Sequence, residues 1–326
     1  MRLIRSLIGI GVLCTALVIG LRIYLDDQLA KPVAVTTVDV PMGTPAQAVL
    51  KILAPELSGV LGSLIFRLHP ELTGLQAGRY AFVADLTVFD ALNAIAAGDA
   101  IQNRWTIPEG IRSRDLLSRL AEDSLFVESV PDAEALTDLL DTGFPHPEGA
   151  FLAETYVWKQ QLSRREFLEL AHQALRVELD TAWANRTAAV SEVLQSPYEL
   201  LILASIVEKE TAVAAERPRI AGVFIERLRR GMRLQTDPTV IYGLGERFDG
   251  NLTRRHLREQ TPYNTYRIAG LPPTPIAIVG PDALHAVAAP LITGELYFVA
   301  DGQGAHVFSK TLDEHNANVR RYQLKR

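Results

Sequence analysis

The chain is poor in the residues that build disulfides and metal sites. It has a single cysteine in 326 residues, Cys14, and this lies inside the first apolar run. The rest of the chain therefore has no thiol for an internal disulfide or a cysteine-bound zinc. The seven histidines show no HExxH or other paired spacing of metal ligands. We expect no metal site.

The loops that bind nucleotides or activate a serine are also missing. The sequence has no GxGxxG or GxxxxGK[ST] loop and no GxSxG elbow. Its formal net charge is −5, whereas nucleic-acid binding normally needs a basic face. We expect no cofactor and no nucleic acid, and a small molecule or a neutral polymer fits better as a partner.

The N-terminal residues 1–27 contain a long apolar run, from Leu7 to Leu21. Arg2 and Arg5 precede the run, and it continues past Arg22. If Arg22 snorkels, the span approaches the roughly 20 residues that cross a bilayer. A cleaved signal peptide is the alternative, but no convincing small-x-small site follows. We expect an uncleaved inner-membrane anchor with a cytoplasmic N-terminus, a single pass, and the C-terminal bulk in the periplasm.

Strand and helix patterns alternate in residues 28–112. Short β-branched or aromatic stretches predict strands, and amphipathic stretches predict helices. The predicted strands cover residues 31–40, the region of Tyr80 and Phe82, and residues 103–107; the predicted helices cover residues 46–53 and 87–97. This layout is typical of LysM-like glycan-binding units, with a ligand-free α+β spacer as the alternative. We expect a mostly helical connector over residues 113–195 and a further domain over residues 196–326.

A buried helix that carries two acids is predicted to begin after Ser196. Ser196 can cap it, Pro197 suits its first position, and Glu199 would complete a capping box. Its apolar residues lie almost all round the helix, so at least one of Glu208 and Glu210 should be partly desolvated. Desolvation raises a carboxyl pKa, which suits a general acid. The alternative is that the two acids only mark the helix leaving the core.

Polar residues beside a proline form a second candidate set. Gln235, Thr236 and Asp237 precede Pro238, so we expect them to be extended at the end of a turn, where they can reach a sugar. A helix cap is the alternative for Asp237.

Aromatic and amide side chains form a third set. Tyr263, Asn264 and Tyr266 suit stacking on pyranose rings and hydrogen bonding to acetamido groups, with a structural turn as the alternative. His306 follows a predicted strand and is a candidate for the same cleft, although a lone histidine is more often structural.

Four separated motifs carry a resemblance to a known family. They are ASIVEKET, RLRRGMRLQTDPTVIYG, YNTYRIAGLPPTPI and YFVADGQGAHVFS. In this order they resemble the endolytic murein transglycosylases of the MltG (YceG-like) family, and the resemblance covers essentially the whole chain. It implies an α+β protein with an N-terminal transmembrane helix, a LysM-like subdomain, a helical connector and a C-terminal mixed α/β catalytic domain. The sequence departs from the family at Ala153 and Glu154, where members usually have Pro-Asp.

The resemblance implies that Glu210 is the acid and base of a lytic transglycosylase. In such a reaction one Glu protonates the bridging oxygen between two sugars, and the C6 hydroxyl of the muramic acid closes a 1,6-anhydro ring. Glu208 is the alternative acid, or a partner of Arg233 or Lys209. The implied partners are peptidoglycan glycan strands and the inner membrane, with peptidoglycan synthases or division proteins as further candidates. A hydrolase that uses water, with Asp237 as its second carboxylate, and a non-catalytic cell-wall-binding scaffold are the alternatives.

The candidate site residues fall into two groups. Glu210 is the catalytic candidate. The binding or supporting candidates are Glu208, Arg233, Gln235, Thr236, Asp237, Tyr263, Asn264, Tyr266 and His306.

Overall fold

The structure, a computed structural model, describes residues 2–323 except residues 58, 130–135, 137 and 141–143, and it describes no side chain of residues 2–10. The chain divides into two compact units. The first comprises Met1–Trp105 with Tyr156–Gln161, and the second comprises Thr106–Thr155 with Leu162–Arg326. The finer division at residues 27, 112 and 195 stays a prediction.

Short helices in the first unit pack around one apolar core with a two-stranded sheet. Its elements are α1 (Arg2–Leu29), β1 (Thr37–Val40), α2 (Ala46–Leu53), α3 (Val60–Leu68), β2 (Gly78–Ala81), α4 (Val88–Ala97) and β3 (Asn103–Thr106). β1 and β2 are antiparallel, with Val38 opposite Tyr80, and both side chains are buried in the core. Because strand residues alternate between two faces, Val40 also points into the core while Thr37 and Asp39 are exposed.

Local signals predict most elements of the first unit correctly. The predicted helices at 46–53 and 87–97 are confirmed as α2 and α4; the side chain of Thr87 caps α4, and Gly98 ends it in the left-handed conformation. The predicted strand at 31–40 is shorter than expected. The amides of Val33 and Ala34 donate to the carbonyls of Leu86 and Leu53, so they form no ladder with a neighbouring strand.

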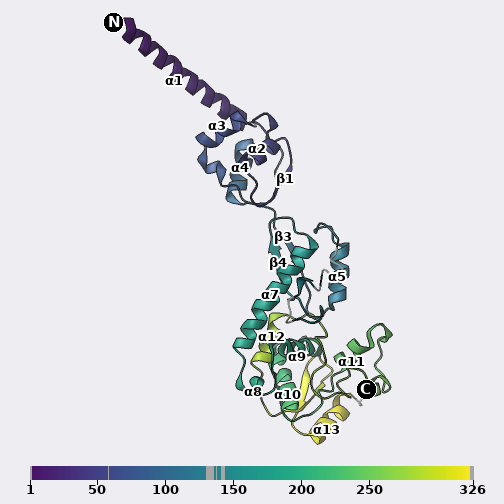
Figure 1. Cartoon of the computed structure of the whole chain (residues 1–326). Helices are drawn as coiled ribbons and strands as arrows, with labels where there is room; N and C mark the ends of the chain where they lie inside the picture. The colour runs from purple at the N-terminus through teal and green to yellow at the C-terminus, as the bar shows by residue number, and fades with distance from the viewer. Residues whose placement is uncertain (1, 58, 130–135, 137, 141–143, 324–326) are drawn as a thin grey trace. The chain divides into compact units, whose positions relative to one another are not determined.

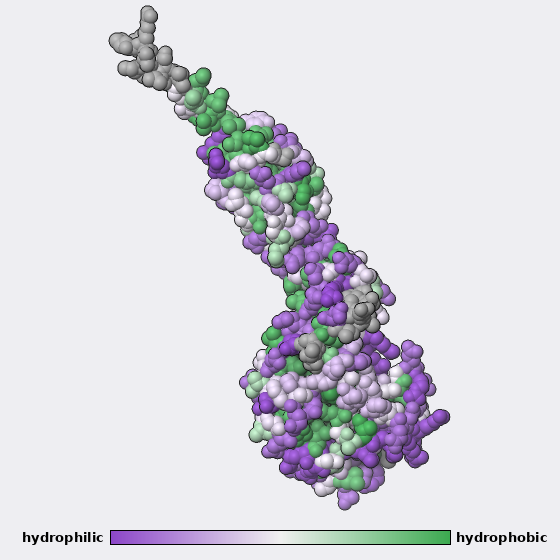
Figure 2. All heavy atoms as spheres, in the orientation of Figure 1, coloured by the Kyte–Doolittle hydropathy of each residue, from purple (hydrophilic) through white to green (hydrophobic). Residues whose placement is uncertain are grey.

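Helix α1 ends inside the core of the first unit. Leu25 and Leu29 near its C-terminal end are buried, whereas the preceding turns expose apolar side chains such as Leu17 and Ile23. In Figure 2 the coloured part of this helix is largely green, the colour of hydrophobic residues. In the part of the chain that the structure describes, no helix is both long enough and apolar enough to span a membrane. The predicted anchor, whose residues 1–10 have no described side chains, stays a prediction.

Helices dominate the second unit and surround α9 (Figure 1). Its elements are α5 (Ser113–Glu122), α7 (Arg164–Ala184), α8 (Ala188–Ser191), α9 (Pro197–Glu210), α10 (Arg217–Arg229), α11 (Asp237–Leu244), α12 (Pro281–Ala288), β5 (Tyr297–Ala300), β6 (His306–Ser309) and α13 (Leu312–Tyr322). β4 (Thr155–Trp158), of which residues 156–158 belong to the first unit, pairs with β3. Residues 200–207 of α9 are all buried, as its nearly continuous apolar sequence predicts, because α7, α10, α11 and α12 pack against it.

The strands of residues 196–323 form one antiparallel hairpin, β5–β6, in which Phe298 lies opposite Phe308. The α+β fold class is therefore confirmed. The hairpin brings His306, at the start of β6, to the region where α9 ends, through a contact with Glu216.

Candidate active site

The helix that carries the two acids begins at Pro197. Ser196 caps it as predicted, because its hydroxyl accepts a hydrogen bond from the amide of Glu199 at 3.2 Å. The reciprocal half of the predicted capping box is wrong. The carboxylate of Glu199 accepts from the amide of Gln195 at 2.6 Å, one residue before the cap.

Glu208 points into the interior and is held by an ion pair. Its Oε1 accepts from Nη2 of Arg217 at 2.9 Å, its Oε2 accepts from the amide of Gly280 at 3.1 Å, and its side chain is 3% exposed. Burial raises the pKa of this carboxyl group, against the opposing effects of the Gly280 amide and Arg217. The predicted pairing with Arg233 or Lys209 is wrong. Those two cations donate to the carbonyls of Tyr266 and Gly110.

Arg217, which no sequence pattern marked as a site residue, contacts three parts of the second unit. It lies at the start of α10 and contacts Glu109 at 2.7 Å, Glu208 at 2.9 Å and Asp282 at 3.3 Å. Its own side chain is 7% exposed. A buried cation with these partners fixes the C-terminal turn of α9 against α10 and α12.

Glu210, the last residue of α9, faces a cavity of about 470 Å³. Of the other predicted residues, Gln235, Thr236, Asp237, Tyr266 and His306 also line this cavity. The hydroxyl of Thr236 donates a hydrogen bond to Oε1 of Glu210. Thr236 is itself fixed, since its amide donates to the hydroxyl of the buried Thr265 at 3.0 Å.

The electrostatics of the cavity suit a proton donor. Burial raises the pKa of Glu210 from 4.5 to about 7. The hydrogen bond from Thr236 opposes this shift, the negative charge of Asp237 adds to it, and the charges of His306 and Arg227 oppose it. A carboxyl group with a pKa near 7 is substantially protonated at neutral pH, which is what a general acid requires.

Asp237 and Tyr266 form a hydrogen-bonded pair in the cavity wall. The hydroxyl of Tyr266 donates to Oδ1 of Asp237 at 2.7 Å, and burial followed by this bond raises the pKa of Tyr266. Thr236 is the residue before α11 and is extended as predicted, but Asp237 is the first residue of the helix. The predicted extended conformation is therefore wrong for Asp237, and so is the alternative that Asp237 caps the helix. Gln235 has φ = +50°, in the left-handed region that non-glycine residues rarely adopt.

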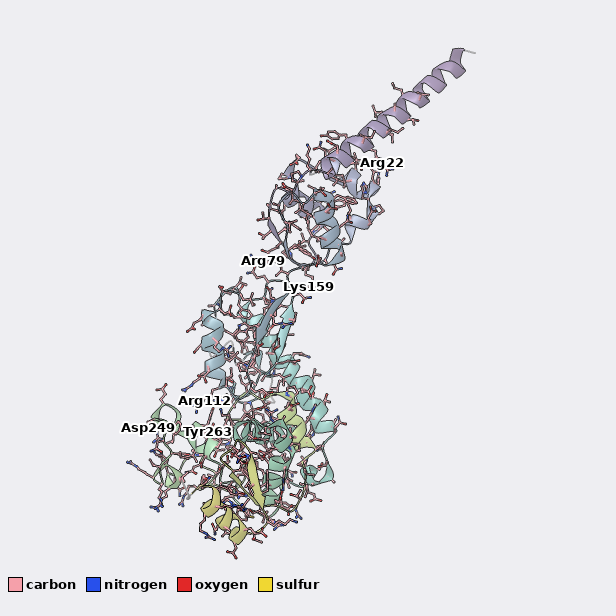
Figure 3. All side chains as sticks on the ribbon, turned by 180° about the vertical axis from the view of Figure 1, so that it is seen from behind. Arg22, Arg79, Arg112, Lys159, Asp249 and Tyr263 are labelled. Carbon is pink, nitrogen blue, oxygen red and sulfur yellow. The ribbon has the colours of Figure 1, made fainter. Side chains whose placement is uncertain are left out.

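Asn264 and Tyr263 support the site and do not line the cavity. Asn264 is fully buried, donates to the carbonyls of His256 and Glu259, and accepts from the amide of Tyr266. These contacts favour the alternative of a structural turn. Tyr263 is labelled in Figure 3. Its hydroxyl is hydrogen-bonded to that of Thr274 at 2.9 Å, and its ring packs on the ring of Tyr242. The guanidinium of Arg112 lies over the ring of Tyr242.

Basic side chains that the sequence did not single out line the same cavity. Arg227 is buried and donates to the carbonyls of Leu296 and Leu234, both at 2.6 Å, with its guanidinium 5.2 Å from the ring centre of Tyr297. His315 stacks on Tyr297. Their local sequence gives no signal, because Arg227 lies among other arginines on a helix and His315 lies on a mostly polar helix.

Comparison with known proteins agrees with this arrangement. The YceG-like family matches residues 38–321. An endolytic murein transglycosylase from Bacillus subtilis (strain 168) is 29% identical over 334 residues, which cover 94% of this chain and 91% of the relative. Another of that description, from Streptococcus pneumoniae serotype 2, is 25% identical over 97% of this chain but only 64% of its own length.

A solved structure is similar as well. The crystal structure of a YceG-like protein from Listeria monocytogenes superposes with a TM-score of 0.56 at 28% identity, over 86% of this chain and 97% of that one. Since the family match extends over residues 38–321, far more than half of the sequence, the chain belongs to the YceG-like family.

Proposed function

We propose that the protein is an endolytic lytic transglycosylase. It cleaves the β-1,4 bond between N-acetylmuramic acid and N-acetylglucosamine inside nascent peptidoglycan strands, leaves 1,6-anhydro-muramic ends, and so terminates strand elongation. The observation that carries the proposal is Glu210, a carboxyl group with its pKa raised to about 7 in an open cavity. The names of the bacillar and streptococcal relatives support the same activity.

The chemistry follows from one acid and an intramolecular nucleophile. Glu210 donates its proton to the bridging oxygen as the bond from that oxygen to the anomeric carbon breaks. The C6 hydroxyl of the same muramic acid attacks the anomeric carbon and loses its proton, which returns Glu210 to its acid form. Because the nucleophile belongs to the substrate, proximity replaces a second carboxylate and no water is consumed.

A hydrolase that uses water is the second candidate, since Asp237 lines the same cavity as Glu210. Two carboxylates on either side of a glycosidic bond are the usual hydrolytic arrangement. Against this role, Oδ1 of Asp237 already accepts the hydroxyl of Tyr266.

Mass spectrometry of the products separates the two candidates. Purified glycan strands digested by the full-length protein should give fragments that end in anhydro-muramic acid, each one water lighter than a reducing-end fragment. Fragments cut within the strand, and not only at its end, are expected for an endolytic enzyme. If all fragments carried reducing ends, the protein would be a hydrolase. If the strands stayed uncut but were still bound, the protein would be a non-catalytic scaffold.

We also propose that α1 anchors the protein in the inner membrane, with Arg2 and Arg5 on the cytoplasmic side and the rest in the periplasm. The proposal is supported by the order of basic and apolar residues in the sequence. The first unit would then place or bind the glycan near the membrane, where synthases or division proteins are candidate partners.

A fusion tests the topology. A reporter that is active only in the periplasm, joined to the C-terminus, should be active, and the mature protein should keep its N-terminus. A silent reporter, or a mature N-terminus near Ala30, would contradict the anchor.

A further inference from the structure

His306 is held by the carboxylate of Glu216, which no local sequence pattern marks. Glu216 ends a short turn of helix, Ala214–Glu216, 90 residues before His306. Its Oε2 lies 2.7 Å from Nδ1 of the imidazole, and its Oε1 accepts the backbone amide of the same residue at 2.8 Å. Both side chains are 14% exposed. The two contacts fix the ring as well as the strand that carries it.

The pairing determines which ring nitrogen is available. Burial alone would raise the pKa of Glu216, but the hydrogen bonds and the charge of His306 outweigh it and lower that pKa. Glu216 is therefore an anion at neutral pH and accepts the Nδ1 proton, which leaves a lone pair on Nε2 in the neutral ring. Within the described residues Nε2 has no hydrogen-bond partner, and His306 lines the cavity of Glu210.

The hydrogen bond to Glu210 leaves only one of its carboxyl oxygens free, so a second group is useful to accept the proton of the C6 hydroxyl. Oε1 of Glu210 already accepts the hydroxyl of Thr236, so Oε2 is the oxygen left to carry the proton for the bridging oxygen. That one oxygen can donate to the bridging oxygen and accept from the C6 hydroxyl only in succession. A neutral imidazole in the same cavity can take the second proton while the glycosidic bond is breaking.

We infer that His306, positioned by Glu216, is the base that deprotonates the C6 hydroxyl; the inference rests on the proposed transglycosylase function. The proton on Glu210 passes to the bridging oxygen, which also takes the electron pair of its bond to C1. A lone pair of O6 forms the new bond to C1, and the O6 proton passes to Nε2 of His306. Return of this proton from Nε2 to the Glu210 carboxylate restores both groups, and no other reactant is needed. Glu216 is a positioning residue and touches no reacting atom.

Chemical rescue tests the assignment. In the full-length protein, His306→Ala should slow formation of anhydro ends by about 10² to 10⁴, and added imidazole should restore part of the rate by occupying the space left by the ring. The matched control is His285→Ala. His285 pairs with Glu178 at 2.6 Å through its Nε2 but does not line the cavity, so its loss should change neither the rate nor the response to imidazole.

Glu216→Gln gives a readout that a purely structural role would not move. Without this carboxylate the ring loses the acceptor that holds its Nδ1 proton, so Glu216→Gln should lower kcat for anhydro-end formation and leave KM for glycan strands unchanged. Glu216→Asp keeps a carboxylate and should restore part of kcat. An unchanged kcat in Glu216→Gln, or a change in KM alone, would count against the positioning role.

The outcomes separate this inference from the function on which it rests. If the wild type makes anhydro ends and His306→Ala makes them at a near wild-type rate, the inference is overturned and the function stands. A slow variant that melts like wild type but is not restored by imidazole also overturns it. If His306→Ala does not fold, His306→Gln replaces it, and a wild-type rate there is decisive against the base. Reducing ends from the wild type would overturn the function itself.

Discussion

Glu210→Gln should abolish the anhydro product while leaving the fold and glycan binding intact. Glutamine has nearly the same shape and can still accept the hydroxyl of Thr236, but it cannot donate a proton to the bridging oxygen. Proton transfer by a positioned group contributes about 10² to 10⁴ in rate, so we expect a loss of at least this size. The measurement is chromatography of digested glycan strands, with thermal melting alongside.

The same variant should be more stable than wild type at alkaline pH. The pKa of Glu210 is about 7 in the folded protein against 4.5 ordinarily, so the stability that its protonated form contributes is present below pH 4.5 and lost as the pH rises through 7. Glutamine does not ionise, so Glu210→Gln should melt like wild type at acidic pH and above it at alkaline pH. The wild-type rate should likewise fall as the pH rises above about 7, because the acid loses its proton.

Glu208→Gln is the matched control, two residues earlier on the same helix. It weakens the contact with Arg217 and should lower the melting temperature, yet the folded fraction should keep more activity than Glu210→Gln. Anhydro ends at a near wild-type rate from Glu210→Gln would remove the central assignment. If Glu208→Gln were the inactive variant instead, the acid would have to be Glu208.

Arg217→Met should destabilise the second unit by about 3–5 kcal/mol, because it leaves the Glu208 carboxylate buried without its partner. Burial raises the pKa of Glu208 already in the wild type, and the loss of Arg217 raises it further. The deficit should therefore shrink as the pH falls, since the orphaned carboxyl group becomes protonated. Urea unfolding at mildly alkaline and at mildly acidic pH measures both effects, because the carboxyl group of Glu208 is charged only at the higher pH.

Arg229→Met, on the same helix α10, is the control. Arg229 is half exposed, and Glu226, its partner, keeps a second contact to Arg230. The expected cost is below about 1 kcal/mol, as for other exposed ion pairs. Equal losses in the two variants, or a deficit in Arg217→Met that does not depend on pH, would show that the buried network does not stabilise the unit in this way.

The sequence predicts what depends on neighbouring residues. The cap at Ser196, the buried face of α9 and the ends of α4 follow from local side chains and periodicity, and all three are present. The sequence does not predict the ion pair between Glu208 and Arg217. Arg217 also binds Glu109, which lies 108 residues earlier in the chain, and only the packing of the unit brings Arg217 and Glu109 together. The pair of Glu216 and His306 is 90 residues apart in the same way.

Some local patterns have two outcomes that only the surroundings decide. A Tyr-Asn-Thr-Tyr stretch suits stacking on sugars and also suits a structural turn. Asn264 became structural because carbonyl groups of His256 and Glu259 lie within reach of its amide, while Tyr266 reached the cavity beside Asp237. Residues 31–40 have the composition of a longer strand, but the backbone bonds available at Val33 and Ala34 are to a helix end and a loop.

The way α1 enters the first unit has a mechanical consequence. The helix runs unbroken over Arg2–Leu29, and Leu25 and Leu29 belong to the core. No flexible joint therefore separates its exposed apolar turns from the folded body of that unit. A pull or twist on the helix would be transmitted directly to the packed leucines and so to the core of the first unit. A chain shortened to begin after residue 27 would lose Leu25 from that core and would keep Leu29 only at its new N-terminal end.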